Sequence, residues 1–474
     1  MAYTTINKSS DYFRIKTYAG NSTNNTAITW DETDTNMQPD FLWLKQRTVA
    51  DQEHWLCDSV RGAEYFLESD TNNTQSDGTG GFDSFDTNGF TVDNTARTNR
   101  GTMVGWGWLA GGTAPTKTYK VVVVSDSGNK YRFRNSADDT TFGSSAVTLD
   151  LQEGGTYTFD VSDSTVNSHP FVLGTSSGVD GSYSTGVTYK LDGVTKTYSQ
   201  YTSGFSSATS RQLIITVAAS APTLYYNCSV HSGMGGQINT NASHGSSNFD
   251  GTTQSLVSAN TTAGFSIVKW TGDGSDNNVI GHGLGTAPKM YLYKKVDGTG
   301  NWYWRLNAVA DSSQDYLQFN STAGKSDDSA TYDAPSDTLF NNYGYAIGNV
   351  VITYCFAEIP GYSRFGYYEG NGDSNGPYIY TGFKPVFTMI KRTDSTDWFG
   401  VSDNQRQTAI NDGTRKLATA NTSDVEGTLA IDYYSNGFKL RNTNGGVNAD
   451  GGKYIYMAFG QTIVGSNNIP ATAR

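Results

Sequence analysis

The stretch Pro39-Asp-Phe-Leu-Trp-Leu-Lys45 decides the fold, because its pattern returns twice along the chain. Pro-Lys-Met-Tyr-Leu-Tyr-Lys occupies 288–294, and Pro-Val-Phe-Thr-Met-Ile-Lys occupies 385–391. In each copy a proline stands six positions before a lysine that closes an apolar run. Short apolar runs bounded by turn residues are typical of buried strands, so the sequence predicts the same strand in three repeats.

Further landmarks surround this strand in each copy. The copies open with a strand that ends in aromatic-x-Gly, at Tyr18-Ala-Gly20, Trp270-Thr-Gly272 and Tyr368-Glu-Gly370. Asn88-Gly89-Phe90 and Asn436-Gly437-Phe438 are hairpin signals, because Asn-Gly favours the positive φ values of a type I′ turn. Each copy is near the size of a single β-sandwich.

The domain organisation follows from these landmarks. We expect β-sandwich repeat 1 at 1–111, an inserted domain at 117–240, repeat 2 at 262–360, repeat 3 at 362–461, and a C-terminal tail at 462–474. The inserted domain lacks the landmarks, and its apolar residues alternate with polar ones, which predicts an antiparallel sandwich. The predicted class is all-β, with three tandem lectin-like or jelly-roll-like sandwiches. Short linkers predict that these stack in series, which suits a fibre or spacer.

Composition and charge exclude several classes of protein. Lys plus Arg number 33 and Asp plus Glu 45, which gives a net charge of −12 without a basic cluster, so nucleic acid is not an expected partner. No apolar run approaches the length of a membrane span, and the first residues do not resemble a signal peptide. Cys57, Cys228 and Cys355 lie far apart, so no disulfide framework is expected.

One group of residues in the inserted domain has the chemistry of a metal site. His169 precedes an apolar strand, and Cys228-Ser-Val-His231-Ser-Gly-Met234 follows another. One thiolate, two imidazoles and one thioether form the ligand set of a trigonal copper site with a weak axial methionine. The alternative is structural, with Cys228 and Met234 packed as small apolar side chains.

These residues resemble the cupredoxins, the blue-copper family. Cys-x₂-His-x₂-Met is similar to the short ligand loop of amicyanin and pseudoazurin, and the strand-turn-strand at 147–161 resembles the segment that leads to the first ligand. The resemblance implies a cupredoxin-like Greek-key sandwich in which His169, Cys228, His231 and Met234 bind type 1 copper. Cupredoxins place an asparagine after the first histidine, whereas this chain has Pro170, which has no N–H to offer the sulfur. We therefore expect a lowered reduction potential.

Other candidate sites are weaker. His54 and Cys57 lie three residues apart without companion ligands, and His282 stands in a glycine-rich turn, so structural roles are predicted for all three. No H-E-x-x-H or P-loop motif occurs in the sequence. The chain is therefore predicted not to be an enzyme, and no cofactor besides copper is expected.

A second resemblance covers most of the chain. The Pro-x₅-Lys strands, the Asn-Gly-Phe hairpins, Phe-Ala-Glu-Ile-Pro-Gly at 356–361 and the terminal Asn-Asn-Ile-Pro-Ala-Thr-Ala-Arg at 467–474 resemble β-rich structural proteins of marine tailed phages. Similar proteins carry cupredoxin-like modules that end in Cys-Ser-x-His-Ser-Gly-Met-Gly-Gly.

The phage resemblance implies a virion protein assembled in the host cytoplasm, in a tail fibre or tail tip that contributes to host attachment. The alternatives are a capsid decoration protein and a copper protein that transfers electrons or sequesters metal. Expected partners are other virion proteins, further copies of the chain, with a trimer as one arrangement, and a glycan or protein of the host surface.

Overall fold

A computed structural model describes residues 4–77, 80–241, 243–275, 277–306, 313–331, 334–343, 345–407, 411 and 415–462. Strands hold 46% of the residues and helices 5%, which confirms the predicted all-β class. Among the described residues no helix has both the length and the apolar character needed to cross a membrane. The predicted tail lies outside the described residues from position 463 onward.

Unit 1 contains a larger and a smaller sheet, with strand orders β1-β9-β3-β4-β5-β6 and β2-β8-β7. Its elements are η1 (Ser9–Asp11), β1 (Phe13–Asn21), β2 (Thr26–Thr29), β3 (Phe41–Gln46), β4 (Trp55–Asp58), β5 (Tyr65–Glu68), β6 (Ser76–Asp77), β7 (Phe82–Asp86), β8 (Gly89–Val92) and β9 (Arg100–Trp108).

Unit 2 has the orders β20-β21-β22-β29-β24-β25-β26-β27 and β23-β28. Its elements are β20 (Ser246–Asn248), β21 (Ser255–Asn260), β22 (Phe265–Thr271), β23 (Asn277–Gly281), β24 (Met290–Lys295), β25 (Tyr303–Leu306), β26 (Ser313–Gln318), β27 (Ser326–Thr331), β28 (Leu339–Tyr343) and β29 (Val350–Phe356).

Unit 3 has the orders β30-β38-β32-β33-β34-β35 and β31-β37-β36. Its elements are β30 (Ser363–Glu369), β31 (Tyr378–Tyr380), β32 (Phe383–Arg392), β33 (Phe399–Asp403), β34 (Arg415–Thr419), β35 (Gly427–Leu429), β36 (Ile431–Tyr434), β37 (Gly437–Leu440), α2 (Gly445–Asn448) and β38 (Lys453–Thr462).

The larger sheets of the three units share one strand order. In each, the first strand pairs with the last, the last pairs with the Pro-x₅-Lys strand, and the following strands continue outward, although β20 and β21 extend the sheet of unit 2. The lysine of each such strand, Lys45, Lys294 or Lys391, is fully buried. The repeated spacing in the sequence therefore marks equivalent positions in the fold.

The inserted domain follows unit 1 and has two sheets, β11-β10-β13-β17-β15-β16 and β12-β19-β18-β14. Its elements are β10 (Thr116–Ser125), β11 (Asn129–Phe133), β12 (Leu149–Gln152), β13 (Thr156–Asp160), η2 (Ser164–Val166), β14 (Phe171–Gly174), β15 (Val187–Leu191), β16 (Val194–Lys196), α1 (Tyr198–Gly204), η3 (Phe205–Ser207), β17 (Arg211–Thr216), β18 (Leu224–Cys228) and β19 (Gln237–Asn241). Strand β10 pairs with β13 and strand β12 with β19 in parallel, so the expectation of a purely antiparallel sandwich is wrong. A separate apolar core lies between the sheets.

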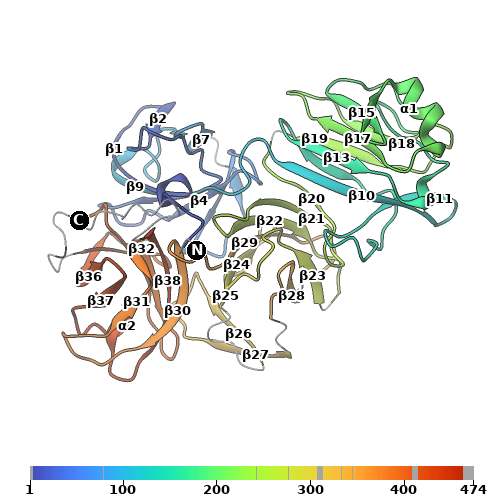
Figure 1. The fold of residues 1–474 in the computed structure, drawn as a ribbon. Coiled ribbons are helices and arrows are strands. Elements are labelled where there is room, and N and C mark those ends of the chain that lie inside the picture. The colour runs from blue at the N-terminus through green and yellow to red at the C-terminus, as the bar shows by residue number, and fades with distance from the viewer. Residues whose placement is uncertain are drawn as a thin grey trace.

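The three units pack around one aromatic core instead of standing in a line. Figure 1 shows units 1, 2 and 3 in blue, olive and orange around a common centre, with the green inserted domain to one side. The shared core takes Trp108 from unit 1, Tyr354 from unit 2 and Phe387 from unit 3. The other face of each larger sheet covers a core of its own unit. Both faces are therefore buried, which explains why strands such as β3 are apolar almost without interruption.

Buried side chains link the units in a closed cycle. Each donates a hydrogen bond to a backbone carbonyl of the next unit, and the three bonds run from Trp302 Nε1 to Glu68 O (2.7 Å), from His54 Nε2 to Thr419 O (3.0 Å) and from Lys391 Nζ to Thr322 O (2.9 Å). Unit 2 thus contacts unit 1, unit 1 contacts unit 3, and unit 3 contacts unit 2. The expected stacking in series is wrong. The face of each larger sheet that points away from its own smaller sheet is apolar, and these three faces pack against one another.

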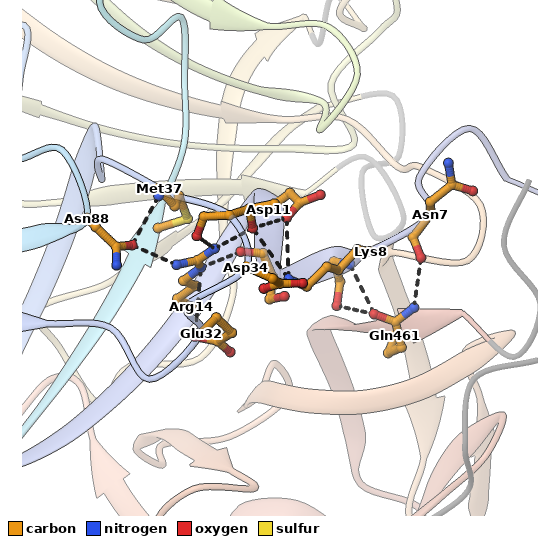
Figure 2. Close-up of polar contacts among 12 residues, drawn as sticks. Asn7, Lys8, Asp11, Arg14, Glu32, Asp34, Met37, Asn88 and Gln461 are labelled. Carbon is orange, nitrogen blue, oxygen red and sulfur yellow. Dashed lines mark hydrogen bonds and ion pairs between the residues drawn. The ribbon is translucent and has the colours of Figure 1, made fainter.

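The N-terminal segment joins unit 1 to unit 3. Figure 2 shows the side chain of Gln461, which lies in β38, against the segment that precedes β1. Its Oε1 accepts hydrogen bonds from the backbone N–H (3.0 Å) and the hydroxyl (2.8 Å) of Ser9. On the other side, the buried guanidinium of Arg14 donates to Asn88 Oδ1 (2.9 Å) and to Thr35 O (2.9 Å). The N-terminal segment is therefore part of the folded body that units 1, 2 and 3 form.

The Asn-Gly hairpins form where predicted but not as type I′ turns. Gly89 and Gly437 are the first residues of β8 and β37, and neither Asn88 nor Asn436 has a positive φ. A Cβ on Gly89 would lie 2.1 Å from Ile28 O, and one on Gly437 would lie 2.3 Å from the equivalent carbonyl of β31. Glycine is thus required by the close approach of the neighbouring strand.

Two side chains clamp both connections of the inserted domain. The buried carboxylate of Asp40 in unit 1 accepts a hydrogen bond from Gly112 N (3.0 Å) and lies 2.6 Å from His244 Nδ1. Gln152 of the inserted domain donates to Gly112 O (2.8 Å) and accepts from Gly245 N (2.9 Å). The chain enters the domain beside Gly112 and leaves it beside His244, so these bonds fix its attachment to the body.

Candidate metal centre

Strand pairing brings three of the predicted ligands together. Cys228 ends β18 and pairs with Phe171, the first residue of β14, in antiparallel register. His169 lies just before β14 and His231 lies in the turn after β18, so both reach the same end of the sheet. Ser229 N donates to Pro170 O (3.0 Å), which joins the two segments. Residues far apart in the sequence thus meet because two antiparallel strands end side by side.

The three ligand atoms form a compact triangle. Nδ1 of His169 lies 3.1 Å from Nδ1 of His231, and Sγ of Cys228 lies 3.9 Å and 3.6 Å from these nitrogens. A metal bonded at about 2.0 Å to nitrogen and about 2.3 Å to sulfur holds such ligand atoms roughly 3–4 Å apart. Within the described residues this is the one group of at least three potential ligands whose atoms converge. The donor set and its dimensions fit a copper ion.

Burial sets the electrostatics of the centre. Cys228 is fully buried and His169 is 6% exposed, whereas His231 is exposed to solvent. Burial, together with the neighbouring His231, lowers the pKa of His169 below its ordinary value. The His169 imidazole is therefore neutral at pH 7, which is the form that binds a metal.

Met234 follows His231 closely in the sequence. Its side chain is buried and belongs to the same apolar core as Cys228. The glycines that follow it explain how the loop turns back against the sheet. A Cβ on Gly235 would lie 1.6 Å from Tyr226 O, and Tyr226 N donates to Gly236 O (3.0 Å). The Met-Gly-Gly sequence therefore serves close packing of the loop. The role of Met234 as an axial ligand stays a prediction.

Strand β11 supports the centre, and sequence reasoning missed it. The amide nitrogen of Asn129 lies 3.3 Å from Nε2 of His169, which leaves Nδ1 of that ring facing the sulfur. Tyr131 N donates to Met234 O (2.9 Å), and the Tyr131 hydroxyl donates to His169 O (2.8 Å). Burial, together with the neighbouring Cys228, raises the pKa of Tyr131 well above its ordinary value. No local motif marks these residues, because they come from β11 of the other sheet and reach the ligands through the packing of the two sheets.

The remaining histidines have structural surroundings. The ring of His54 accepts a hydrogen bond from Trp43 Nε1 (2.8 Å), and burial lowers its pKa well below the ordinary value. His282 donates from Nε2 to Ser336 O (3.1 Å) and accepts from Leu284 N (3.1 Å). Burial raises the pKa of Cys57 to about 12. These contacts satisfy the buried rings and keep the thiol neutral, in agreement with the predicted structural roles.

Comparison with known proteins gives one match. The family described as "Domain of unknown function (DUF7483)" matches residues 8–149 and 238–462. No curated protein and no solved structure was found to match the chain. The matched residues hold units 1, 2 and 3, whereas His169, Cys228, His231 and Met234 all lie in the interval between the matched segments.

Proposed function

This chain belongs to the DUF7483 family, and we propose that it is a non-enzymatic structural protein of a tailed-phage virion. The observation that carries the proposal is the closed body of three sandwiches around one aromatic core. A body of this kind buries both faces of its larger sheets and joins its units by hydrogen bonds in a closed cycle, which supports a structural role. The resemblance of the sequence to structural proteins of tailed phages is the reason for proposing a virion as the particle.

The shape favours a position at the end of a tail. Units that cluster around a centre form a globular body, which suits a tail tip or the head of a fibre better than an extended shaft. Such a position brings the chain into contact with other virion proteins and with a glycan or protein of the host surface. A position on the capsid as a decoration protein is the alternative outcome of the test below.

Labelling of intact virions tests the proposal. Antibodies against the full chain, with gold-conjugated secondary antibodies, should mark the tail ends of purified particles in electron micrographs. Peptides of the chain should appear in mass spectra of the same particles. Label over the capsid would favour the decoration role, and purified virions without the chain would refute a structural role altogether.

A second role, for the inserted domain alone, is the binding of copper. The triangle of His169 Nδ1, His231 Nδ1 and Cys228 Sγ supports this role. A thiolate and neutral imidazoles suit Cu(I) and Cu(II). A bound copper ion would supply one-electron redox chemistry, or the inserted domain would store the ion. Because the domain is clamped to the body by Asp40 and Gln152, the metal would be carried at a defined place on it.

Titration of the purified full chain with Cu(II) tests this role. We expect an intense visible band from charge transfer between the thiolate and copper, and its loss in Cys228→Ser. Cys355→Ser is the matched control, because Cys355 is also a fully buried free cysteine but lies in unit 2. A colourless wild-type chain, or equal colour in Cys228→Ser, would refute copper binding at this site.

A further inference from the structure

A cavity of about 340 Å³ opens on unit 2, between β24, β25, β26 and the segment that follows β28. Its volume lies in the range of pockets that bind small molecules. Tyrosine rings and cations gather in it, and the described lining residues include Tyr293, Tyr303, Tyr316, Tyr345, Lys295 and Arg305. The cavity is separate from the candidate metal centre, which lies in the inserted domain.

The equivalent positions of unit 1 are apolar and covered. Tyr303 corresponds to Trp55 and Arg305 to Cys57, because their partners across the strands lie one and three positions before the repeated lysine in both units. Trp55 and Cys57 belong to the core of unit 1, under a smaller sheet of three strands. The described residues of unit 2 form a smaller sheet of two strands. The repeated fold therefore does not require a tyrosine and an arginine at these positions.

The side chains of the cavity hold one another in place. Tyr303 stacks on Tyr293 with ring centroids 5.4 Å apart, and it meets Tyr316 edge-on at 5.4 Å. The guanidinium of Arg305 is buried over the rings of Tyr293 and Tyr316, at 5.9 Å and 5.8 Å from their centroids. Tyr345 packs edge-on against Tyr293 at 6.3 Å. Side chains that are already ordered lose little further freedom when a ligand binds, which favours binding.

The loop between β24 and β25, which forms one wall of the cavity, is held from two sides. Lys294 donates from Nζ to Gly300 O, and Gly300 N donates to Asn72 O of unit 1 (2.9 Å). Val296 O accepts a hydrogen bond from the hydroxyl of Thr74, also in unit 1 (2.7 Å). The packing of unit 1 against unit 2 therefore fixes this wall.

The chemistry of the lining suits a sugar that carries an acid group. A tyrosine presents a ring to the C–H groups of a sugar and a hydroxyl to its oxygens, and the amides of Asn301 and Asn349 both donate and accept. The charged residues among the described lining are the cations Lys295 and Arg305, in a chain of net charge −12. Asp297 lies 3.9 Å from the Lys295 ammonium, beyond hydrogen-bond distance, so the ammonium can donate to a carboxylate of the ligand.

We propose that this cavity binds an acidic sugar residue, a sialic or uronic acid, of a host-surface glycan. The sugar ring lies against Tyr303, Tyr316 and Tyr345, which are all partly exposed, and its carboxylate accepts a hydrogen bond from Lys295. Arg305 keeps the tyrosine rings in position. The inference rests on the proposed virion role, because attachment to a host brings such a glycan to the chain, and it adds the site and the class of ligand.

The experiment measures binding of the purified full chain to an array of sialylated and uronic-acid glycans beside neutral glycans of similar length. Lys295→Gln removes the cation that contacts the carboxylate. Gly300→Leu narrows the cavity without removing a side chain, since Gly300 has no positive φ and a Cβ there would lie 3.6 Å from Lys295, an ordinary contact. Gly427→Leu is the matched control, because Gly427 is exposed in unit 3 and a Cβ there would meet nothing within 4 Å.

We expect the wild-type chain to bind acidic glycans and not neutral ones. Binding should weaken at least about tenfold in Lys295→Gln, because a hydrogen bond to a charged group contributes about that factor, and by a similar factor in Gly300→Leu. Gly427→Leu should bind as the wild type does. Thermal melting of each variant shows whether it is folded, and added NaCl should weaken the binding because it screens the ion pair.

Failure of the inference and failure of the virion role give different results. A folded wild-type chain that binds no acidic glycan, or that binds neutral glycans equally well, overturns the inference. Undiminished binding in Gly300→Leu overturns it too, because the glycan would then bind elsewhere. In each of these cases labelling can still find the chain on virions. Virions without the chain refute the virion role, whereas binding of acidic glycans by the purified chain would still assign the cavity.

Discussion

Phe387→Ala is predicted to destabilise unit 1 as well as unit 3, in which Phe387 lies. The ring is fully buried in β32 and contacts Phe13, Trp106 and Trp108 of unit 1 at centroid distances of 5.6 Å, 6.1 Å and 5.7 Å. Within unit 3 it contacts Phe459 at 6.2 Å. Truncation of a buried phenylalanine to alanine costs about 3–5 kcal/mol, since it loses transfer free energy and leaves a cavity. Most of that cavity would face unit 1.

Amide hydrogen exchange measures how far this loss extends. A cost of about 3 kcal/mol corresponds to roughly hundredfold faster exchange of the amides protected by the affected contacts. We expect this acceleration in β1 and β9 of unit 1 as well as in β32. The matched control is Phe438→Ala, because Phe438 is equally buried but belongs to the core between the two sheets of unit 3. Exchange in β1 and β9 that is unchanged by Phe387→Ala would refute the shared core.

Three further predictions concern the clamp, the buried lysines and Pro170. Asp40→Ala removes the acceptor of Ala110 N (2.7 Å) and Gly112 N, so we expect a loss of about 3 kcal/mol in urea unfolding and faster proteolysis near Gly112. Unchanged cleavage would contradict the clamp. Burial lowers the pKa of Lys391 to about 8 from 10.5. Between about pH 8 and pH 10.5 the side chain therefore carries a proton in the unfolded chain but not in the folded chain. The free energy of unfolding should rise with pH across that window. Lys391→Met should reduce this rise without abolishing it, because burial also lowers the pKa of Lys45, Lys117 and Lys294 to about 8. An identical pH profile of unfolding would argue against a neutral Lys391. Pro170→Ala gives the residue after His169 a backbone N–H, so the copper reduction potential should rise, and an equal or lower potential in voltammetry would contradict the reasoning from Pro170.

The repeated strand could be predicted from its sequence, but its surroundings could not. A run such as Phe41-Leu-Trp-Leu-Lys45 indicates a strand that is buried on both faces, and the structure confirms this burial. Nothing in the run says which element covers each face, because burial is non-directional and any apolar surface serves. The prediction of stacking in series depends on linker length alone. It fails because the aromatic faces of the larger sheets pack together in the shared core.

The candidate site shows the same division. The spacing of Cys228 and His231 within one turn predicts a candidate ligand pair, because both residues are local, and His169 joins them through the pairing of β14 with β18. Asn129 and Tyr131 contact His169 from the opposite sheet, and neither is a residue type that is diagnostic of a metal. Their roles depend on which strands become neighbours, which is information that the local sequence does not contain.

Fusion of three like units into one polypeptide has a consequence for stoichiometry. A ring assembled from three identical subunits would display either three inserted domains or none. In this chain the insertion occurs at a single junction, between units 1 and 2, so each ring displays one inserted domain in a unique direction. The three units therefore make near-equivalent contacts with one another, whereas the inserted domain marks one side of the body that they form. A threefold-symmetric partner could bind this body in three distinguishable orientations.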